Sequence, residues 1–128
     1  GASGGCQAEI GSGSGMAAAA ICYIKGGTME QLGHACAMAL KNLMGLVCDP
    51  VAGLVEVPCV KRNVAGAVNA LAAADMSLAG IVSQIPPDQV VDAMKEVGDA
   101  MDSSLKETGK GGLAATPRGK SVKISCRI

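Results

Sequence analysis

The chain contains 128 residues, with eleven basic and eleven acidic side chains and therefore no formal net charge. It has no Trp or Phe and one Tyr, whereas apolar residues make up 49% of it and glycine occupies 18 positions. These values predict one domain with a core of small side chains. They disfavour nucleic-acid binding, which needs a basic face or aromatic platforms for stacking bases.

No segment has the features of a membrane span or a secretory signal. The apolar run Met16–Ile24 is too short, because a spanning helix needs about 20 apolar residues. Its upstream flank carries no positive charge and includes Glu9. We therefore expect a soluble, cytoplasmic protein with no membrane partner. In that setting the six cysteines are not expected to form disulfides.

The chain opens on a Gly- and Ser-rich stretch that contains Cys6. A helix is predicted to begin at about Ser14 and to run to about Lys25. We predict that Gly11–Gly15 forms a loop whose backbone N–H groups cradle a small anion. Ser12 and Ser14 are then candidates for binding a substrate carboxylate. A flexible connector or close backbone packing is the alternative explanation of the same glycines.

Thr28 is predicted to open the second helix, because Gln31 stands three residues later and completes a capping-box pattern. Apolar residues at helical spacing carry this helix to about Gly45. His34, the only histidine, lies off the main apolar stripe. We interpret it as a structural or exposed residue rather than a catalytic one.

A third helix is predicted from about Cys59 to Gly80. Its apolar residues keep the helical period and include Val60, Val64, Val68 and Leu71. Lys61 and Arg62 lie in the first turn, where the positive end of the helix disfavours cations. A nearby anion, ordinary solvation or a salt bridge would each account for them. Arg62 and Asn63 follow Cys59 by one turn, so both are candidates for contact with a substrate.

A fourth helix is predicted to begin at Pro86-Pro87, because proline favours the first position of a helix. Its apolar stripe is predicted to extend from Val90 to Leu105, and its acidic residues are assigned to the solvated face. The remainder, Gly109–Ile128, is Gly-rich and basic and is predicted to be an irregular tail. Within it, Val122–Cys126 is a candidate for an extended segment that docks on the body.

The six cysteines divide into two groups by their sequence context. Cys22 and Cys36 lie within apolar helical patterns and are interpreted as buried thiols that act as small hydrophobes. The other four lie in Gly-rich, Pro-rich or terminal segments: Cys6, Cys48, Cys59 and Cys126. Asp49-Pro50 and Pro58 disfavour a continuous helix between Cys48 and Cys59, which predicts a shaped loop with a thiol at each end.

Three of these thiols suggest a metal site. Cys6, Cys48 and Cys59 make an incomplete shell for structural zinc, which takes four ligands. Three cysteines can instead hold a [4Fe–4S] cluster and leave one iron without a protein ligand. Such an iron can act as a Lewis acid on a substrate oxygen. From the spacing alone, a cluster is favoured over zinc, but reduced structural cysteines are the commoner explanation.

Longer motifs of the chain resemble those of one enzyme family. They are Gly5–Gly11 (GCQAEIG), Gly45–Gly53 (GLVCDPVAG), Val57–Asn63 (VPCVKRN) and Lys106–Ala114 (KETGKGGLA). In this order they are similar to segments of the iron–sulfur-dependent L-serine dehydratases. The resemblance is to the C-terminal part of that family's α domain or α subunit. It implies that residues 1–128 are one piece of an enzyme whose upstream α segment and β domain lie outside this sequence.

The resemblance, together with the helical patterns, implies an all-α fold. We expect a compact domain of about four main helices, with Gly- and Pro-rich cluster-binding loops and an irregular C-terminal tail. Cys6, Cys48 and Cys59 match the family's three ligands to a [4Fe–4S] cluster. Cys126 resembles a tail cysteine that occupies the open iron site until substrate arrives.

The reaction that the resemblance implies is the deamination of L-serine to pyruvate and ammonia, without pyridoxal phosphate. It proceeds by Lewis-acid β-elimination of the hydroxyl group, and no residue of this chain is assigned as the catalytic base. The implied partners are a β subunit or β domain, a small amino-acid substrate and further copies in an oligomer.

Two other hypotheses remain open at this point. The chain could belong to a related iron–sulfur lyase that acts on L-cysteine or L-threonine, or it could be a helical fragment without catalytic activity. The first hypothesis is distinguished from an L-serine dehydratase by comparing pyruvate release from serine with the reactions of cysteine and threonine. A brown protein with about four irons after anaerobic reconstitution would exclude the second.

Overall fold

The computed structural model describes residues 1–122, and these fold into helices without any strand. The elements in chain order are η1 (Gln7–Gly11), α1 (Ser12–Ile24), α2 (Met29–Asn42), η2 (Val51–Gly53), α3 (Cys59–Leu78), α4 (Pro87–Ala100), η3 (Ser103–Leu105), η4 (Gly112–Ala115) and α5 (Pro117–Ser121). The predicted all-α class with four main helices is confirmed. Within these residues, no helix combines the length and the hydropathy needed to cross a membrane.

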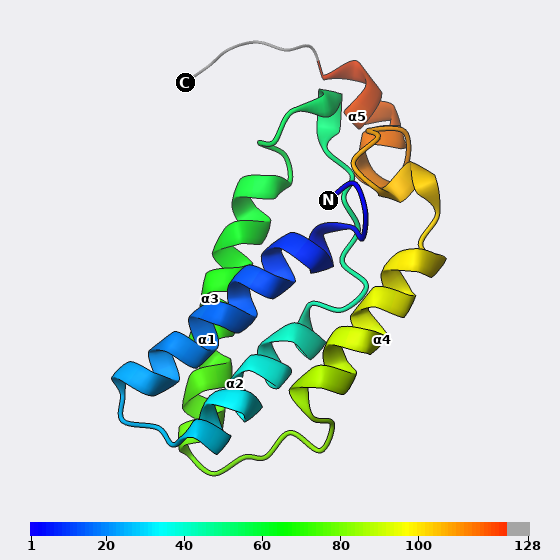
Figure 1. Ribbon diagram of the computed structural model, residues 1–128. Helices are drawn as coiled ribbons and strands as arrows, with labels where there is room; N and C mark the ends of the chain where they lie inside the picture. The colour runs from blue at the N-terminus through cyan, green and yellow to red at the C-terminus, as the bar shows by residue number, and fades with distance from the viewer. Residues whose placement is uncertain (123–128) are drawn as a thin grey trace.

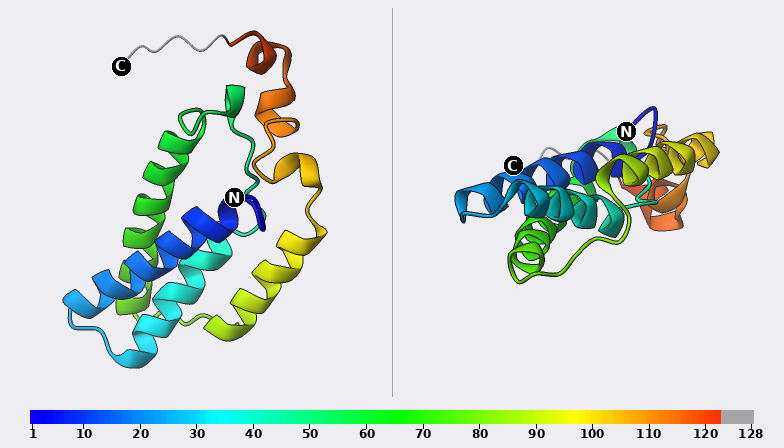
Figure 2. Two further views of the ribbon diagram at one scale, coloured as in Figure 1. Left: turned by 45° about the horizontal axis from the view of Figure 1, so that its top comes forward. Right: turned by 60° about the horizontal axis from the view of Figure 1, so that its bottom comes forward.

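Helices α1, α2 and α3 pack against one another, and α4 packs against α2 (Figure 1). The short elements η2, η4 and α5 contact each other and gather at the end of the bundle where α3 begins (Figure 2). Segments from the middle and from the C-terminal third of the sequence therefore lie together at this end of the bundle. The loops that carry Cys48 and Cys59 belong to it.

The bundle core consists mainly of small side chains, as the composition predicts. The largest buried cluster contains Ala18, Cys22, Ala35, Met38, Ala39, Ala70, Ala73 and Ala74. Small residues let helix backbones approach closely, which compensates for the missing aromatic side chains. The prediction of a buried thiol is confirmed for Cys22, whereas Cys36 is only partly buried.

Helix α3 places its small residues inward and its large apolar residues at the surface. Gly66, Ala70 and Ala73 are buried against the other helices. Val60, Val64 and Val68 are each about 60% exposed, and Leu71 is 49% exposed. The helical period of the sequence is real, but it does not mark the packed face, because close helix contact selects small side chains.

The first helical segment begins earlier than predicted. A single turn of π-helix, η1, leads directly into α1, so Gly11–Gly15 lies within a helix and not in a loop. Because its backbone N–H groups belong to helical turns, they do not form the predicted loop that cradles an anion, and that prediction is wrong. Close packing explains Gly15, because a Cβ there would lie 3.1 Å from Leu40 Cγ of α2.

Other boundaries follow local signals more closely. Thr28 and Gln31 form the predicted capping box at the start of α2, and Pro87 occupies the first turn of α4. Helix α4 ends at Ala100, so Leu105 lies in η3 rather than on the predicted helical stripe. The described part of the tail is more ordered than predicted, because it contains η4 and α5. Residues 123–128, with Cys126, lie outside the described part.

The close contact of η1 with α3 at Gly66 can be tested by a pair of substitutions. A Cβ at Gly66 would lie 2.7 Å from Ile10 Cγ2, which is closer than packed atoms approach. Gly66→Ala is therefore expected to lower the free energy of unfolding by about 1–3 kcal/mol, as overpacking does. Urea unfolding followed by circular dichroism measures the change.

Gly13→Ala is the matched control, because it makes the same change in an exposed helical position. Its added Cβ would meet no atom within 4 Å. Alanine is the better helix former, so this variant is expected to gain about 0.5–1 kcal/mol. A similar gain at both positions would contradict the close packing at Gly66.

Candidate metal centre

Three cysteines from three separate segments line one cavity. Cys6 immediately precedes η1, Cys48 lies in the loop after α2, and Cys59 is the first residue of α3. Their exposed fractions are 3%, 4% and 7%. The cavity has a volume of about 210 Å³ and is lined by Cys6, Glu9, Ile10, Cys48, Pro50, Val55, Cys59, Asn63 and Glu107. None of these three cysteines forms a disulfide.

The side chain of Gln7 holds Cys6 in place. It is buried, its Nε2 donates to Met94 O at 2.9 Å, and its Oε1 accepts from the N–H of Gly45 at 2.9 Å. The Gln7 N–H also donates to Leu46 O at 2.9 Å. Gln7 therefore ties the start of η1 to α4 and to the loop before Cys48. Sequence reasoning missed this role, although the residue lies in the motif that contains Cys6.

The backbone of Cys48 is held by the segment that follows η3. Its N–H donates to Leu105 O at 2.8 Å, and its carbonyl accepts from the N–H of Glu107 at 2.8 Å. These two bonds form an isolated parallel bridge with Lys106. The thiol of Cys48 is thus positioned by chain far away in sequence, which no local pattern could indicate.

Asp49 and Arg62 join the loop after Cys48 to the first turns of α3. The carboxylate of Asp49 is buried, accepts from Arg62 Nη1 at 2.5 Å and accepts from the N–H of Leu113 at 2.7 Å. Arg62 also donates to Val47 O at 2.8 Å. Among the explanations left open for this cation, the salt bridge is correct. Arg62 does not line the cavity, so its predicted contact with substrate has no support here.

The other predicted substrate-binding residues divide between the cavity and the helix packing. Asn63 lines the cavity, and its Nδ2 donates to Cys59 O at 2.9 Å. The hydroxyl of Ser14 is buried, donates to Gly66 O at 2.7 Å and accepts from Asn69 Nδ2 at 2.8 Å. It therefore serves the contact between α1 and α3. Ser12 is partly exposed on α1 and is not among the residues that line the cavity.

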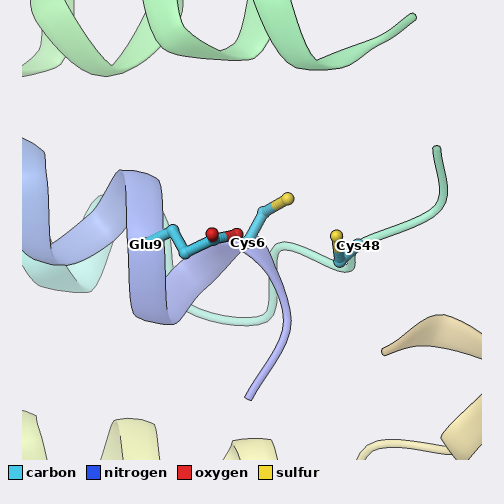
Figure 3. Close-up of side chains that lie close together, drawn as sticks. All are labelled: Cys6, Glu9 and Cys48. Atoms are coloured by element: carbon cyan, nitrogen blue, oxygen red, sulfur yellow. The ribbon is translucent and has the colours of Figure 1, made fainter. Parts of the chain in front are cut away.

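Two carboxylates, which the sequence analysis did not single out as site residues, border the same cavity. Glu9 lies one helical turn after Cys6, and ligand atoms of Cys6, Glu9 and Cys48 all lie within 4.8 Å of one another (Figure 3). Glu107 reaches the cavity from the segment after η3. Both belong to the motifs GCQAEIG and KETGKGGLA, and their membership in those motifs was the available signal.

Burial raises the pKa of two of the cavity thiols, those of Cys48 and Cys59, and so favours their protonated forms. Burial, the hydrogen bond with the Cys6 thiol and nearby negative charge raise the pKa of Cys48 to about 12. The pKa of Cys59 is raised as well, first by burial and then by the charge of Cys6. A metal centre would need the thiolates, so metal binding at this site is expected to release protons.

The raised pKa of Cys48 predicts that the metal-free protein loses stability at alkaline pH. In the unfolded chain the thiol ionises near pH 9, whereas in the folded chain it keeps its proton until about pH 12. The stabilisation is fully present below pH 9, and it declines as the pH rises toward 12. Urea unfolding at pH 7.5, 9 and 10.5 under reducing conditions measures this decline.

Cys48→Ala serves as the comparison in the same experiment, since it removes the titrating thiol and leaves every other group in place. The variant is expected to show a shallower loss of unfolding free energy above pH 9. Equal slopes for the two proteins would contradict a raised pKa at Cys48.

Fold and site together define an all-helical module that presents three buried cysteines and two carboxylates around one cavity. The family model described as serine dehydratase alpha chain matches residues 1–114, and the chain belongs to this family. The resemblance inferred from the motifs is thereby confirmed.

Several curated proteins are similar to this chain. It is 66% identical over 123 residues to the probable L-serine dehydratase alpha chain of Bacillus subtilis. The matched region is 96% of this chain and 41% of the relative. It is 64% identical over 124 residues to the probable L-serine dehydratase alpha chain of Latilactobacillus sakei, with coverage of 97% and 59%. The L-serine dehydratase alpha chain of Peptoniphilus asaccharolyticus is 54% identical over 123 residues, with coverage of 96% and 42%. The chain thus spans about two-fifths to three-fifths of the length of these relatives.

Proposed function

We propose that this chain is the cluster-binding part of an L-serine dehydratase that deaminates L-serine to pyruvate and ammonia. The observation that carries the proposal is the meeting of three buried, reduced thiols, Cys6, Cys48 and Cys59, at one cavity. The names of the relatives support serine as the substrate. Because the relatives are longer and are named alpha chains, the active enzyme in this proposal includes further α chain and a β partner.

The residues at the cavity fit a [4Fe–4S] cluster. Cysteine thiolates are the usual protein ligands of such clusters, and three of them leave one iron open. Structural zinc fits less well, because it takes four protein ligands in a closed tetrahedral shell. When bound, the cluster supplies a Lewis acid for the hydroxyl group of the substrate. Cys6, Cys48 and Cys59 would hold it.

The other residues of the chain prepare this site in three ways. Gln7 and the backbone bridge at Cys48 fix two of the thiols before any metal arrives. Asp49 and Arg62 fix the loop that joins Cys48 to α3. The buried side chain of Ile10 forms an apolar part of the cavity wall and limits the access of water, which strengthens electrostatic interactions inside the site.

Anaerobic reconstitution with iron and sulfide tests the proposal. The full α chain, assembled with its β partner, is expected to become brown, to bind about four irons and to release pyruvate from L-serine. A colourless protein would contradict the cluster. Pyruvate release from L-cysteine, or 2-oxobutanoate release from L-threonine, at a higher rate than the reaction with L-serine would contradict the substrate.

The role of Cys126 as a displaceable fourth ligand remains a prediction, since this residue lies outside the described part of the chain. Cys126→Ala is expected to strengthen the apparent binding of L-serine in the reconstituted enzyme, because the substrate no longer competes with the tail. Unchanged cluster stability and unchanged substrate affinity would argue against the role.

A further inference from the structure

The side of α3 that faces away from the bundle is apolar. Four large residues recur along it at helical spacing: Val60, Val64, Val68 and Leu71. Each has an exposed fraction of at least 49%. Within α3 no charged residue stands between Arg62 and Asp75. A helix that is apolar on its outer side as well as its inner side is typical of the interior of a larger domain, because a helix face that meets water is normally polar.

Helix α1 extends this uncharged surface. It packs against α3 (Figure 1) and contains no charged side chain. Its residues Met16, Tyr23 and Ile24 are each at least 68% exposed. The outer side of α4 is different, since five charged residues are exposed there: Asp88, Asp92, Lys95, Glu96 and Asp99. Among residues 1–122, α4 therefore presents a charged surface, whereas α1 and α3 present an uncharged one.

A groove of about 230 Å³ lies between α1 and α3. Most of the residues that line it are small: Gly13, Ser14, Ala17, Asn63, Gly66 and Ala67. Ala67 is a surface neighbour of Val64 and Leu71, which lie three residues before it and four residues after it. The groove therefore has a floor of small side chains beside a ridge of large apolar ones. This shape can receive the side chains of another helix.

The groove adjoins the cavity of the three cysteines. Glu9, Ile10 and Asn63 line both spaces. Asn63 lies one turn after Cys59 on α3, so the groove meets the cavity beside this thiol. A segment seated in the groove therefore also bounds the cavity.

The length of the relatives indicates which segment this is. The matched region is 41% of the alpha chain from Bacillus subtilis and 59% of that from Latilactobacillus sakei. In each relative, the rest belongs to the same polypeptide as the matched region. A segment of the same chain meets the groove at an effective concentration that can reach the order of millimolar, whereas a second copy or a β partner must associate from solution. The rest of the α chain is therefore favoured over both.

From these observations we propose that the part of the α chain outside residues 1–128 places an apolar helix in the groove between α1 and α3. The stripe from Val60 to Leu71 is about 17 Å long, which matches about three turns of such a helix. The inference rests on the proposed function in one respect, because it takes further α chain to be part of the enzyme. It assigns the surface through which that chain reaches the cavity of the three cysteines.

The burial of this surface is tested by alkylation of Val68→Cys in the full α chain. Glu96→Cys is the matched control on the charged side of α4. Residues 63–95 and 96–106 contain no native cysteine, so one tryptic peptide reports each introduced thiol. The rate with iodoacetamide is compared with the rate in urea. Val68→Cys is expected to react at least about tenfold more slowly in the folded chain, since labelling then requires local opening. Glu96→Cys is expected to react at nearly the rate of the unfolded chain.

The occupant is identified by photo-cross-linking from the same position. Val68 is replaced by a genetically encoded diazirine amino acid in the full α chain, which is irradiated alone and with its β partner. The expected product keeps the mass of one α chain, and mass spectrometry joins position 68 to a peptide outside residues 1–128. Should this probe prevent folding, as judged by circular dichroism, Val64 takes its place.

The other results overturn the proposal. Equal alkylation at positions 68 and 96 would show that the face is not covered. A product with the mass of two α chains would identify a second copy, and one with the mass of α plus β would identify the β partner. A cross-link within residues 1–128 would show that this part of the chain covers itself. Neither measurement uses iron or substrate, so failure of the cluster or of the serine reaction leaves both readouts intact.

Discussion

Replacing Cys59 by serine is expected to abolish both cluster loading and the dehydration of L-serine in the reconstituted enzyme. Cys59 is buried at the first position of α3 and is one of three thiols around the cavity. Serine is nearly the same size, but its hydroxyl does not ionise near neutral pH and is a poor ligand for iron. We expect activity to fall by more than about 100-fold, since even outer partners of metal ligands cost 10- to 100-fold.

The measurement is the iron content and visible spectrum after anaerobic reconstitution, together with pyruvate release. Cys36→Ser is the matched control, because Cys36 is a partly buried thiol of α2 that does not line the cavity. It is expected to load iron and to turn over serine like the parent. Full iron content in the Cys59 variant would show that this thiol is not a ligand.

Replacing Asp49 by alanine is expected to give the largest loss of stability among the substitutions considered. The carboxylate is buried, pairs with Arg62 and accepts a hydrogen bond from the backbone of Leu113. Removing it leaves a mostly buried guanidinium without its counter-charge and leaves the N–H of Leu113 without its acceptor. Breaking one side of such a pair costs about 3–5 kcal/mol. Because Arg62 is partly exposed, we expect a value near the lower end of that range.

The loss of unfolding free energy in Asp49→Ala is measured by urea unfolding and compared with the loss in Asp75→Ala. Asp75 pairs with Lys25 at 2.6 Å, but both side chains are largely exposed. Surface pairs contribute little, so this variant is expected to lie within about 1 kcal/mol of the parent. Similar losses for the two aspartates would mean that Asp49 does not anchor the loop. We also expect Asp49→Ala to weaken iron binding, since the loop carries Cys48.

Local signals in the sequence were sufficient for several helix boundaries. The capping box of Thr28 and Gln31 marks the start of α2, and Pro87 marks the start of α4. Each signal acts through neighbouring residues and needs no tertiary contact. The same kind of reasoning failed at Gly11–Gly15, where glycine suggests a loop. The packing of α1 on its neighbours decides this segment, and that contact is not visible in a local window.

The cavity was predictable only in part. The motifs indicated that Cys6, Cys48 and Cys59 act together, although their spacing alone favoured ordinary structural thiols. The groups that position the thiols were not predicted. Gln7 bonds to Met94 across 87 positions of sequence, and such a contact depends on the complete fold. Arg62 illustrates the same limit, because its sequence context allowed several partners and only the structure identifies Asp49.

The bridge between Cys48 and the segment after η3 has a consequence for biosynthesis. Cys48 gains its two backbone partners only after Leu105 and Glu107 have been made. A ribosome adds about 5–20 residues per second, so the thiols of a nascent chain remain unassembled for seconds after Cys59 appears. For the proposed cluster, we therefore expect iron and sulfide to enter the site only after the segment that contains Glu107 has been made and has paired with Cys48.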